Sequence, residues 1–156
     1  MTLKQSAERI LTTHVGSLPR PRNLLDMMKA ALGGGPYDRE AYAGCIRAAV
    51  AEVVRRQAEA GLDIIADGEQ SKPGFFTYVQ ERLAGFEPRP GLKRTQFAAE
   101  LAAFPEYYEE YFKQAMLGGT IAPIVPIVCT GPVSYRGEEA LARDIDNLKA
   151  AIAGVK

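Results

Sequence analysis

The stretch Gly61-Leu62-Asp63-Ile64-Ile65-Ala66-Asp67-Gly68-Glu69 decides the fold that we predict for this chain. Gly61 follows a long helical pattern, and glycine readily adopts the left-handed conformation that ends a helix. The apolar residues within 62–66 are typical of a strand buried in a parallel sheet. Residues 67–69 then form a polar turn at the carboxyl end of that strand, where α/β folds gather their ligand-binding loops. We therefore expect half of any polar site to lie here.

A second polar loop follows an earlier predicted strand. Residues 9–13 combine Ile10 and Leu11 with two threonines, which favours a first strand. The sequence His14-Val15-Gly16-Ser17-Leu18-Pro19-Arg20 comes next, and its proline disfavours a helix. The loop offers backbone N–H groups and the Ser17 hydroxyl to a ligand. It is the candidate for the other half of the site.

The remaining chain alternates further helices and one more strand region. Helical periodicity predicts helices over 23–32, 38–60 with Asp38 as N-cap, 75–83, 97–116 with an interruption at Pro105, and 138–153 with Leu141, Ile145, Leu148 and Ile152 on its buried face. Residues 85–92 are predicted to be a loop. A strand is predicted over 124–129, with a turn at 130–132. The aromatic residues of 97–116 indicate either ordinary packing or a lid over a pocket.

Strands that alternate with helices predict an α/β fold with a parallel sheet. We predict a (β/α)8 TIM-barrel type of fold, organised as one domain over residues 1–156. A closed barrel typically takes about 250 residues, and we identify three strand regions here. We therefore expect an incomplete barrel of three to four βα units. Its open sheet edges and apolar strand faces predict self-association.

Composition excludes several classes of partner. Nineteen basic residues balance nineteen acidic ones among 156, so neither nucleic acid nor an anionic membrane is an expected partner. No apolar run approaches the roughly 20 residues that span a bilayer, and residues 1–10 do not resemble a signal peptide. We expect a cytoplasmic protein. Cys45 and Cys129 lack a CxxC spacing, which favours buried, reduced thiols over a disulfide.

The two polar loops resemble those of the cobalamin-independent methionine synthase family. That family has a threonine-rich strand that leads into an Ile/Val-Gly-Ser-Phe/Leu-Pro turn, matched here at 12–19. It also has a Gly-Leu-Asp strand that leads into a His/Asp-Gly-Glu turn, matched here at 61–69. Residues 78–86 and 129–135 resemble later parts of the same barrel. Related coenzyme M transferases share these turns.

The resemblance implies a TIM-type barrel that transfers a methyl group from a folate-type donor to a small thiol. It implies a zinc ion, which would deprotonate a thiol whose pKa is near 8.5 in water. The resemblance places the amino-acid end of homocysteine on Val15 and Ser17, and its ammonium on Glu69. His14 and Asp67 complete the candidate substrate-binding set.

Two departures from the family bear on these roles. Asp67 stands where the synthases often have histidine, and His14 where they often have threonine. Each also has a purely structural interpretation: Asp67 as a cap of its own turn, and His14 as a hydrogen-bonded loop residue. Glu69 has the alternative of a solvated turn charge.

The zinc ligands that the resemblance implies are a His-x-Cys pair and a later cysteine, in the second half of the barrel. Nothing after Glu69 in this sequence matches them, so we assign no metal ligand. A site built from His14, Cys129, Asp67 and Glu69 is the less favoured alternative, because catalytic zinc usually takes more nitrogen or sulfur ligands. Two further functions stay open: a non-catalytic half-barrel that binds a small ligand, and part of a coenzyme M-type alkyltransferase.

Overall fold

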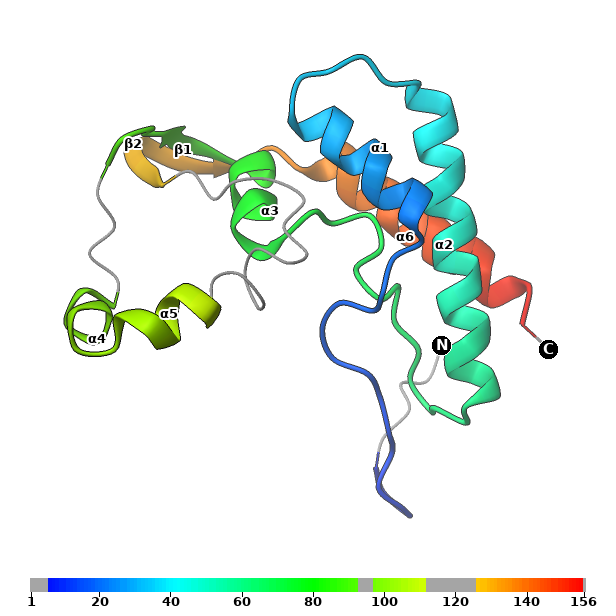
Figure 1. Cartoon of the computed structure of the whole chain (residues 1–156). Coiled ribbons are helices and arrows are strands. Elements are labelled where there is room, and N and C mark those ends of the chain that lie inside the picture. The colour runs from blue at the N-terminus through cyan, green and yellow to red at the C-terminus, as the bar shows by residue number, and fades with distance from the viewer. Residues whose placement is uncertain (1–5, 93–96, 112–125, 156) are drawn as a thin grey trace. The chain divides into compact units, whose positions relative to one another are not determined.

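The computed structural model describes residues 6–92, 97–111 and 126–155 (Figure 1). The chain divides into two compact units, Met1–Pro73 with Gly137–Lys156, and Gly74–Arg136. The prediction of a single domain over residues 1–156 stays a prediction.

Three helices form the first unit: α1 (Arg22–Leu32), α2 (Arg39–Glu59) and α6 (Glu138–Ala153). They confirm the predicted helices over 23–32, 38–60 and 138–153. Asp38 caps α2 as predicted, because its carboxylate accepts hydrogen bonds from the backbone N–H groups of Glu40 and Ala41. Beyond the other end of α2, Gly61 has the left-handed φ of 78° that such a stop requires.

The core of this unit lies where α2 packs against α6 (Figure 1). Val50, Val54 and Ala151 are buried there, and each buried valine stabilises the fold by about 1.5 kcal/mol or more. Four partly buried side chains pack around them: Ile46, Ile65, Leu148 and Val155. On α1, Leu24 and Met28 are fully buried.

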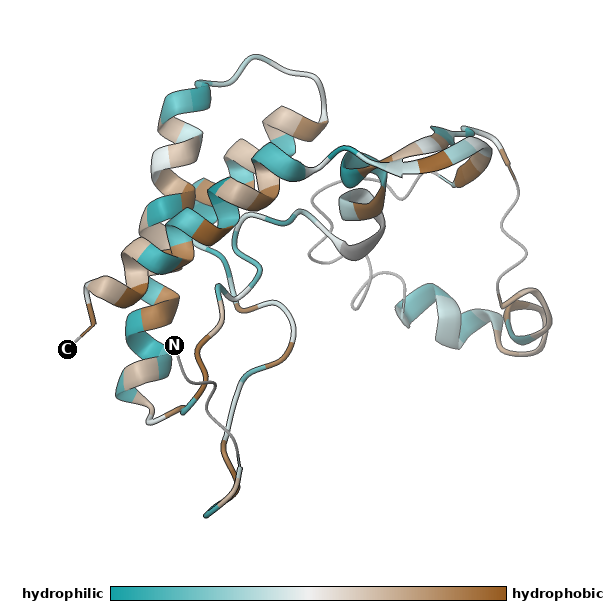
Figure 2. Ribbon diagram, turned by 180° about the vertical axis from the view of Figure 1, so that it is seen from behind, coloured by the Kyte–Doolittle hydropathy of each residue, from teal (hydrophilic) through white to brown (hydrophobic). Residues whose placement is uncertain are grey.

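The predicted buried face of α6 is largely wrong. Leu141, Ile145 and Ile152 are exposed, while Ala151 faces the core. At 100° per residue, the face that contacts α2 is centred on Ala151 and reaches Leu148 only at its edge. Apolar side chains therefore lie beside the contact face of α6, and Figure 2 shows hydrophobic and hydrophilic residues mixed along both helices.

The predicted strands 9–13 and 62–66 meet in the predicted parallel direction, but only through one bridge, Thr13 to Ile64. The backbone N–H groups of Asp63 and Ile64 both donate to Thr12 O at 3.1 Å. Extended strands in a parallel sheet are not found in these segments, and Ile64 is exposed rather than buried. Among the described residues, no further strand pairs with residues 62–66, so their other edge has no strand partner there.

The second unit contains α3 (Phe75–Arg82), β1 (Leu83–Pro88), α4 (Ala98–Ala103), α5 (Pro105–Tyr111) and β2 (Ile127–Tyr135). The helix over 75–83 is confirmed. The break of the 97–116 helix at Pro105 is also confirmed over the described residues; residues 112–116 lie outside them.

The strands of this unit correct two predictions. Residues 85–88, the first part of the loop predicted over 85–92, belong to β1, which pairs antiparallel with β2. The predicted turn 130–132 lies inside β2, where the register shifts opposite Gly85. Gly85 has a φ of +86°, and a Cβ there would lie 2.5 Å from the Pro132 carbonyl oxygen. The local turn signal was therefore overridden by pairing between distant segments. The start of the predicted strand, residues 124–125, lies outside the described residues.

The two units together make a mixed α/β structure, as predicted. The sheet found in the described ranges has two strands, and the barrel stays a prediction. No helix among the residues that the structure covers is both long and apolar enough to cross a membrane.

Candidate functional site

The two predicted loops contact each other through both side chains and backbone. Ser17 Oγ donates a hydrogen bond to Glu69 Oε2 at 2.6 Å. The backbone N–H of Leu18 donates to Gly68 O at 2.9 Å. We call residues 14–20 and 67–72 the two-loop site. The structure thus brings together Ser17 and Glu69, two of the residues that the sequence predicted to bind substrate.

The turn at 68–69 has an unusual backbone conformation. Gly68 and Glu69 have φ angles of 60° and 55°. A left-handed residue other than glycine costs about 1 kcal/mol or more, and persists only where its surroundings hold it. Gln70 helps to hold this turn: it is fully buried, and its Nε2 donates to Leu18 O at 3.0 Å and to Gly68 O at 3.3 Å. The backbone itself therefore aims the Glu69 side chain.

Arg20 binds the same turn from the first loop. Its Nη2 donates to Glu69 O at 2.7 Å and to Lys72 O at 2.5 Å, and its Nε donates to Gln70 O at 3.4 Å. Partial burial lowers the pKa of the Arg20 guanidinium, while the carboxylates of Glu69 and Asp67 oppose that shift. An arginine stays protonated under these conditions, so a positive charge lies beside the turn.

Asp67 fits its structural interpretation. Its Oδ1 accepts a hydrogen bond from the Glu69 backbone N–H at 2.9 Å, and its Oδ2 forms an ion pair with Lys72 Nζ at 2.7 Å. The exposed fractions of the Asp67 and Lys72 side chains are 15% and 25%. The carboxylate therefore caps its own turn, as the alternative prediction had it, and also lies next to Glu69.

His14 and Val15 lie on the first loop without joining this hydrogen-bond network. His14 Nε2 lies 3.0 Å from Gly16 O, so the tautomer protonated at Nε2 donates a bond within the loop. Val15 exposes 87% of its surface. Its predicted part in substrate binding would therefore fall to its backbone groups. The predicted substrate-binding roles of His14, Val15, Ser17, Asp67 and Glu69 stay predictions.

Two polar side chains below the site fix the segment that carries the turn. Asp63 accepts from the backbone N–H and hydroxyl of Thr12 and forms an ion pair with Arg9, and these partners lower its pKa. Gln57 of α2 is buried, and its amide pairs with both the N–H and the C=O of Ala66, at 3.1 and 2.7 Å. The backbone just before residue 67 is therefore tied both to the segment that precedes the first loop and to α2.

The residues present do not fit a zinc ion. Among the described residues, no group of three or more His, Cys, Asp or Glu side chains could hold a metal. Glu69 and Asp67 are engaged with Ser17 and Lys72, and His14 with its own loop. The less favoured site that adds Cys129 is therefore not found, and no chemical step is assigned to a metal here.

Both cysteines are free thiols, as predicted. Cys45 is half-buried, and its Sγ lies 3.5 Å from Asn23 Nδ2. The prediction of a buried thiol is wrong for Cys129, which is exposed.

The site combines the Glu69 carboxylate and the Ser17 hydroxyl with the positive charge of Arg20, which binds the backbone of the same turn. Such a pair can accept hydrogen bonds from an ammonium group, since charge-assisted bonds are the stronger ones. The sequence did not predict the roles of Arg20, Gln57, Gln70 and Lys72. Of these, only Arg20 lies inside a motif that drew attention, and its contacts run to backbone atoms about 50 positions away.

Comparison with known proteins gives a consistent picture. Residues 10–90, just over half of the chain, match the family described as "Cobalamin-independent synthase, Catalytic domain". The chain is 37% identical over 75 residues to a 5-methyltetrahydropteroyltriglutamate–homocysteine methyltransferase of Streptomyces avermitilis, and 36% identical over 76 residues to a methionine synthase of Sulfolobus acidocaldarius. These matches cover 48% and 49% of this chain, but 10% and 22% of those relatives. The chain thus matches a small part of the length of these relatives. The family match over residues 10–90 includes both loops of the site.

Proposed function

This chain belongs to the family of cobalamin-independent synthase catalytic domains, and on that premise we propose that its two-loop site binds the amino-acid end of a homocysteine-type thiol. The reaction would be methyl transfer from a folate-type donor to that thiol, as part of methionine biosynthesis. The observation that carries the proposal is the Ser17–Glu69 hydrogen bond of 2.6 Å. It joins the two family motifs across 52 positions of sequence.

The charges of the site support an ammonium as the bound group. The Glu69 carboxylate is partly exposed, so it can accept a ligand without unfolding the turn. Ser17 is exposed, and its hydroxyl can rotate to donate or accept. The ligand carboxylate would then meet backbone groups of Val15 and Ser17. His14 and Asp67 would act at the edges of this site.

A binding experiment tests the proposal with matched ligands. L-Homocysteine and 4-mercaptobutyrate, which lacks the amino group, are titrated into the chain by isothermal calorimetry. We expect the chain to bind L-homocysteine, and Glu69→Gln to weaken that binding about tenfold, as for loss of one charge-assisted hydrogen bond. The variant should leave the affinity for 4-mercaptobutyrate unchanged.

The control is Glu59→Gln, which removes one negative charge from the exposed surface of α2. Equal affinities of the two variants for L-homocysteine would contradict the role of Glu69. Binding of coenzyme M, a thiol with a sulfonate and no ammonium, in preference to L-homocysteine would favour the alkyltransferase alternative instead. Binding of L-homocysteine without turnover in the presence of the methyl donor would favour the non-catalytic alternative.

Self-association is part of this proposal. Several large apolar side chains of the first unit are exposed, among them Ile10, Val15 and Ile64 near the two loops. A contiguous apolar patch commonly marks an interaction site, and we propose that these side chains contribute to one. Sedimentation velocity over a wide concentration range should show species larger than the monomer of 16.9 kDa. A monomer at every concentration would contradict it.

A further inference from the structure

We propose that Arg20 is a positioning residue that holds the Glu69 carboxylate in its binding conformation, an inference that rests on the proposed role of Glu69. Arg20 ends the loop that carries Ser17, and its guanidinium binds the turn that carries Glu69. It would act on the ligand through Glu69 and not by touching the ligand itself.

The first argument is geometric. Arg20 donates to three carbonyl oxygens of one turn, those of residues 69, 70 and 72, at 2.7, 3.4 and 2.5 Å. A planar guanidinium can satisfy several acceptors at once in a fixed geometry, whereas a lysine ammonium on a flexible stem cannot reproduce that fork. The contacts therefore fix the backbone on both sides of Gln70.

The second argument comes from the strain at Glu69. Its φ of 55° is a conformation that residues other than glycine rarely adopt. Such a conformation needs support from its surroundings. The carbonyl of Glu69 is itself one of the Arg20 acceptors, so the guanidinium bonds directly to the strained residue. Loss of these bonds would let Glu69 relax and move its carboxylate away from Ser17.

The third argument is one of charge. Arg20 has a favourable Coulomb interaction with both carboxylates of the turn, but the two differ in their direct side-chain partners. Asp67 forms a direct ion pair with Lys72. Glu69 has a favourable Coulomb interaction with Arg20 but bonds through its side chain to the neutral Ser17 hydroxyl. Arg20 thus lies on the backbone side of the turn, and its hydrogen bonds run to carbonyl oxygens rather than to the Glu69 carboxylate.

Three variants test this inference. Arg20→Gln removes the charge and most of the fork, and Arg20→Lys keeps the charge but loses the fork. The matched control is Arg22→Gln, two residues away and exposed at the start of α1. We expect Arg20→Gln to weaken L-homocysteine binding about tenfold, Arg20→Lys to weaken it less, and Arg22→Gln to leave it unchanged.

A double-mutant cycle separates positioning from general stabilisation. If Arg20 acts through Glu69, then Arg20→Gln should cause no further loss of affinity in a Glu69→Gln background. An equal tenfold loss in both backgrounds would overturn the inference. Thermal unfolding of each variant, recorded by circular dichroism, identifies any that are not folded at the temperature of the titration. Should Arg20→Gln fail to fold, Arg20→Lys decides the outcome in the same cycle.

A measurement without ligand keeps this inference distinct from the proposed function. The 13Cα and 13Cβ chemical shifts of Glu69 report its left-handed backbone conformation in the free protein. We expect them to move toward ordinary values in Arg20→Gln and Arg20→Lys, and to stay unchanged in Arg22→Gln. Unchanged shifts in all three variants would overturn the positioning role. Altered shifts in the two Arg20 variants, together with a wild-type chain that does not bind L-homocysteine, would overturn the proposed function but support the control of the turn by Arg20.

Discussion

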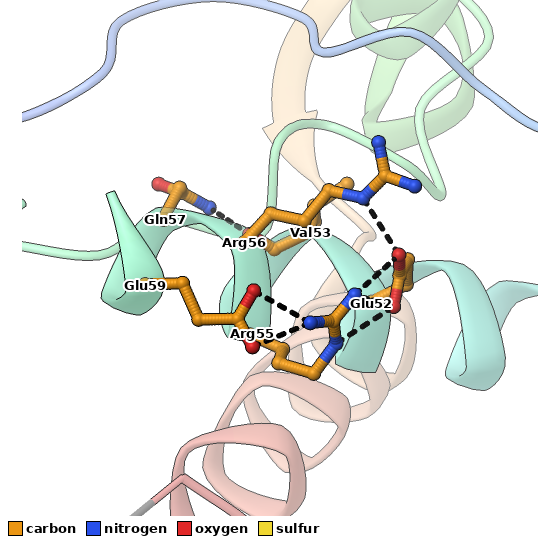
Figure 3. Close-up of polar contacts among 6 residues, drawn as sticks. All are labelled: Glu52, Val53, Arg55, Arg56, Gln57 and Glu59. Carbon is orange, nitrogen blue, oxygen red and sulfur yellow. Dashed lines mark hydrogen bonds and ion pairs between the residues drawn. The ribbon is translucent and has the colours of Figure 1, made fainter. Parts of the chain in front are cut away.

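The surface of α2 and the two-loop site contain ion pairs of similar length, but the side chains of the two regions are exposed to water to very different degrees. On α2, Arg55 binds Glu52 at 2.8 Å and Glu59 at 2.5 Å, and Arg56 binds Glu52 at 2.6 Å (Figure 3). These side chains expose between 40% and 72% of their surface. In the two-loop site, the bond of Lys72 to Asp67 is 2.7 Å long, yet the two side chains are largely shielded.

Bond length alone therefore does not determine how much each of these contacts stabilises the fold. An exposed ion pair exchanges water for a partner of similar quality, so it contributes little. A buried amide cannot form hydrogen bonds with water instead, so loss of its partner leaves a buried polar group without a hydrogen bond. Figure 3 shows both cases on one helix, because buried Gln57 lies on α2 beside the exposed ion pairs. The helix therefore offers its own control.

The largest effect on stability should come from Gln57→Leu. The change leaves both the N–H and the C=O of Ala66 without their side-chain partner. We expect the free energy of unfolding to fall by about 3 kcal/mol, as urea denaturation would measure. Arg56→Leu on the same helix breaks an exposed ion pair and should change it by about 0.5 kcal/mol or less. Equal losses in the two variants would break the comparison.

A smaller loss is expected for Gly68→Ala in the two-loop site. A Cβ there would lie 3.1 Å from the Leu18 side chain and 3.3 Å from that of Val53, at a φ of +60°. Backbone strain and crowding together should cost about 2 kcal/mol in urea denaturation. Gly34→Ala is the control, since it has a φ of +71° but no atom within 4 Å of the added Cβ. Gly34→Ala should lower the free energy of unfolding by about 1 kcal/mol. An equal loss for Gly68→Ala would mean that Leu18 and Val53 move away from the added Cβ at little cost.

The helices show how far local sequence signals reach. Asp38 as N-cap and Gly61 as the stop of α2 follow from the preferences of single residues, and the structure confirms both. The β1–β2 pairing was missed because it joins residues about 40 to 50 positions apart, and glycine and proline at 131–132 indicated a turn. A helix or a cap is determined by residues close together in sequence. A strand needs a pairing partner that lies far away in sequence, and local patterns do not identify that partner.

The site was predictable only in part, for a similar reason. Ser17 and Glu69 were identified from the family motifs, and the structure joins them directly. Arg20 and Gln70 were missed because they bind backbone atoms across the two loops. Backbone acceptors carry no sequence signature, so such contacts become visible only once the loops are placed side by side. The residues that support a site are thus harder to predict than those that contact a ligand.

A third prediction concerns acid. Arg9 and Thr12 lower the pKa of Asp63 below its ordinary value of about 3.9. The ionised form is therefore favoured in the folded state, so its contribution to stability is fully present above about pH 5 and is lost as pH falls further. In Asp63→Asn, the free energy of unfolding should fall less steeply below pH 5 than in the wild type, as measured by urea denaturation at each pH. An unchanged acid slope would show that Arg9 and Thr12 stabilise Asp63 little in solution.

The smallest effect is expected for Glu52→Gln, which sharpens the comparison most. Hydrogen bonds from Arg55 and Arg56 lower the pKa of Glu52 to about 2, so by charge alone it resembles Asp63. Its side chain is 40% exposed, however, against 11% for Asp63. Solvent screening and the entropy of fixing two long arginine side chains should offset most of that ion-pair attraction. The acid slope of Glu52→Gln should therefore match that of the wild type, and 1 M NaCl should remove any remaining difference. A slope as flat as that of Asp63→Asn would mean that the exposed cluster on α2 stabilises the fold as much as the shielded contacts below the site.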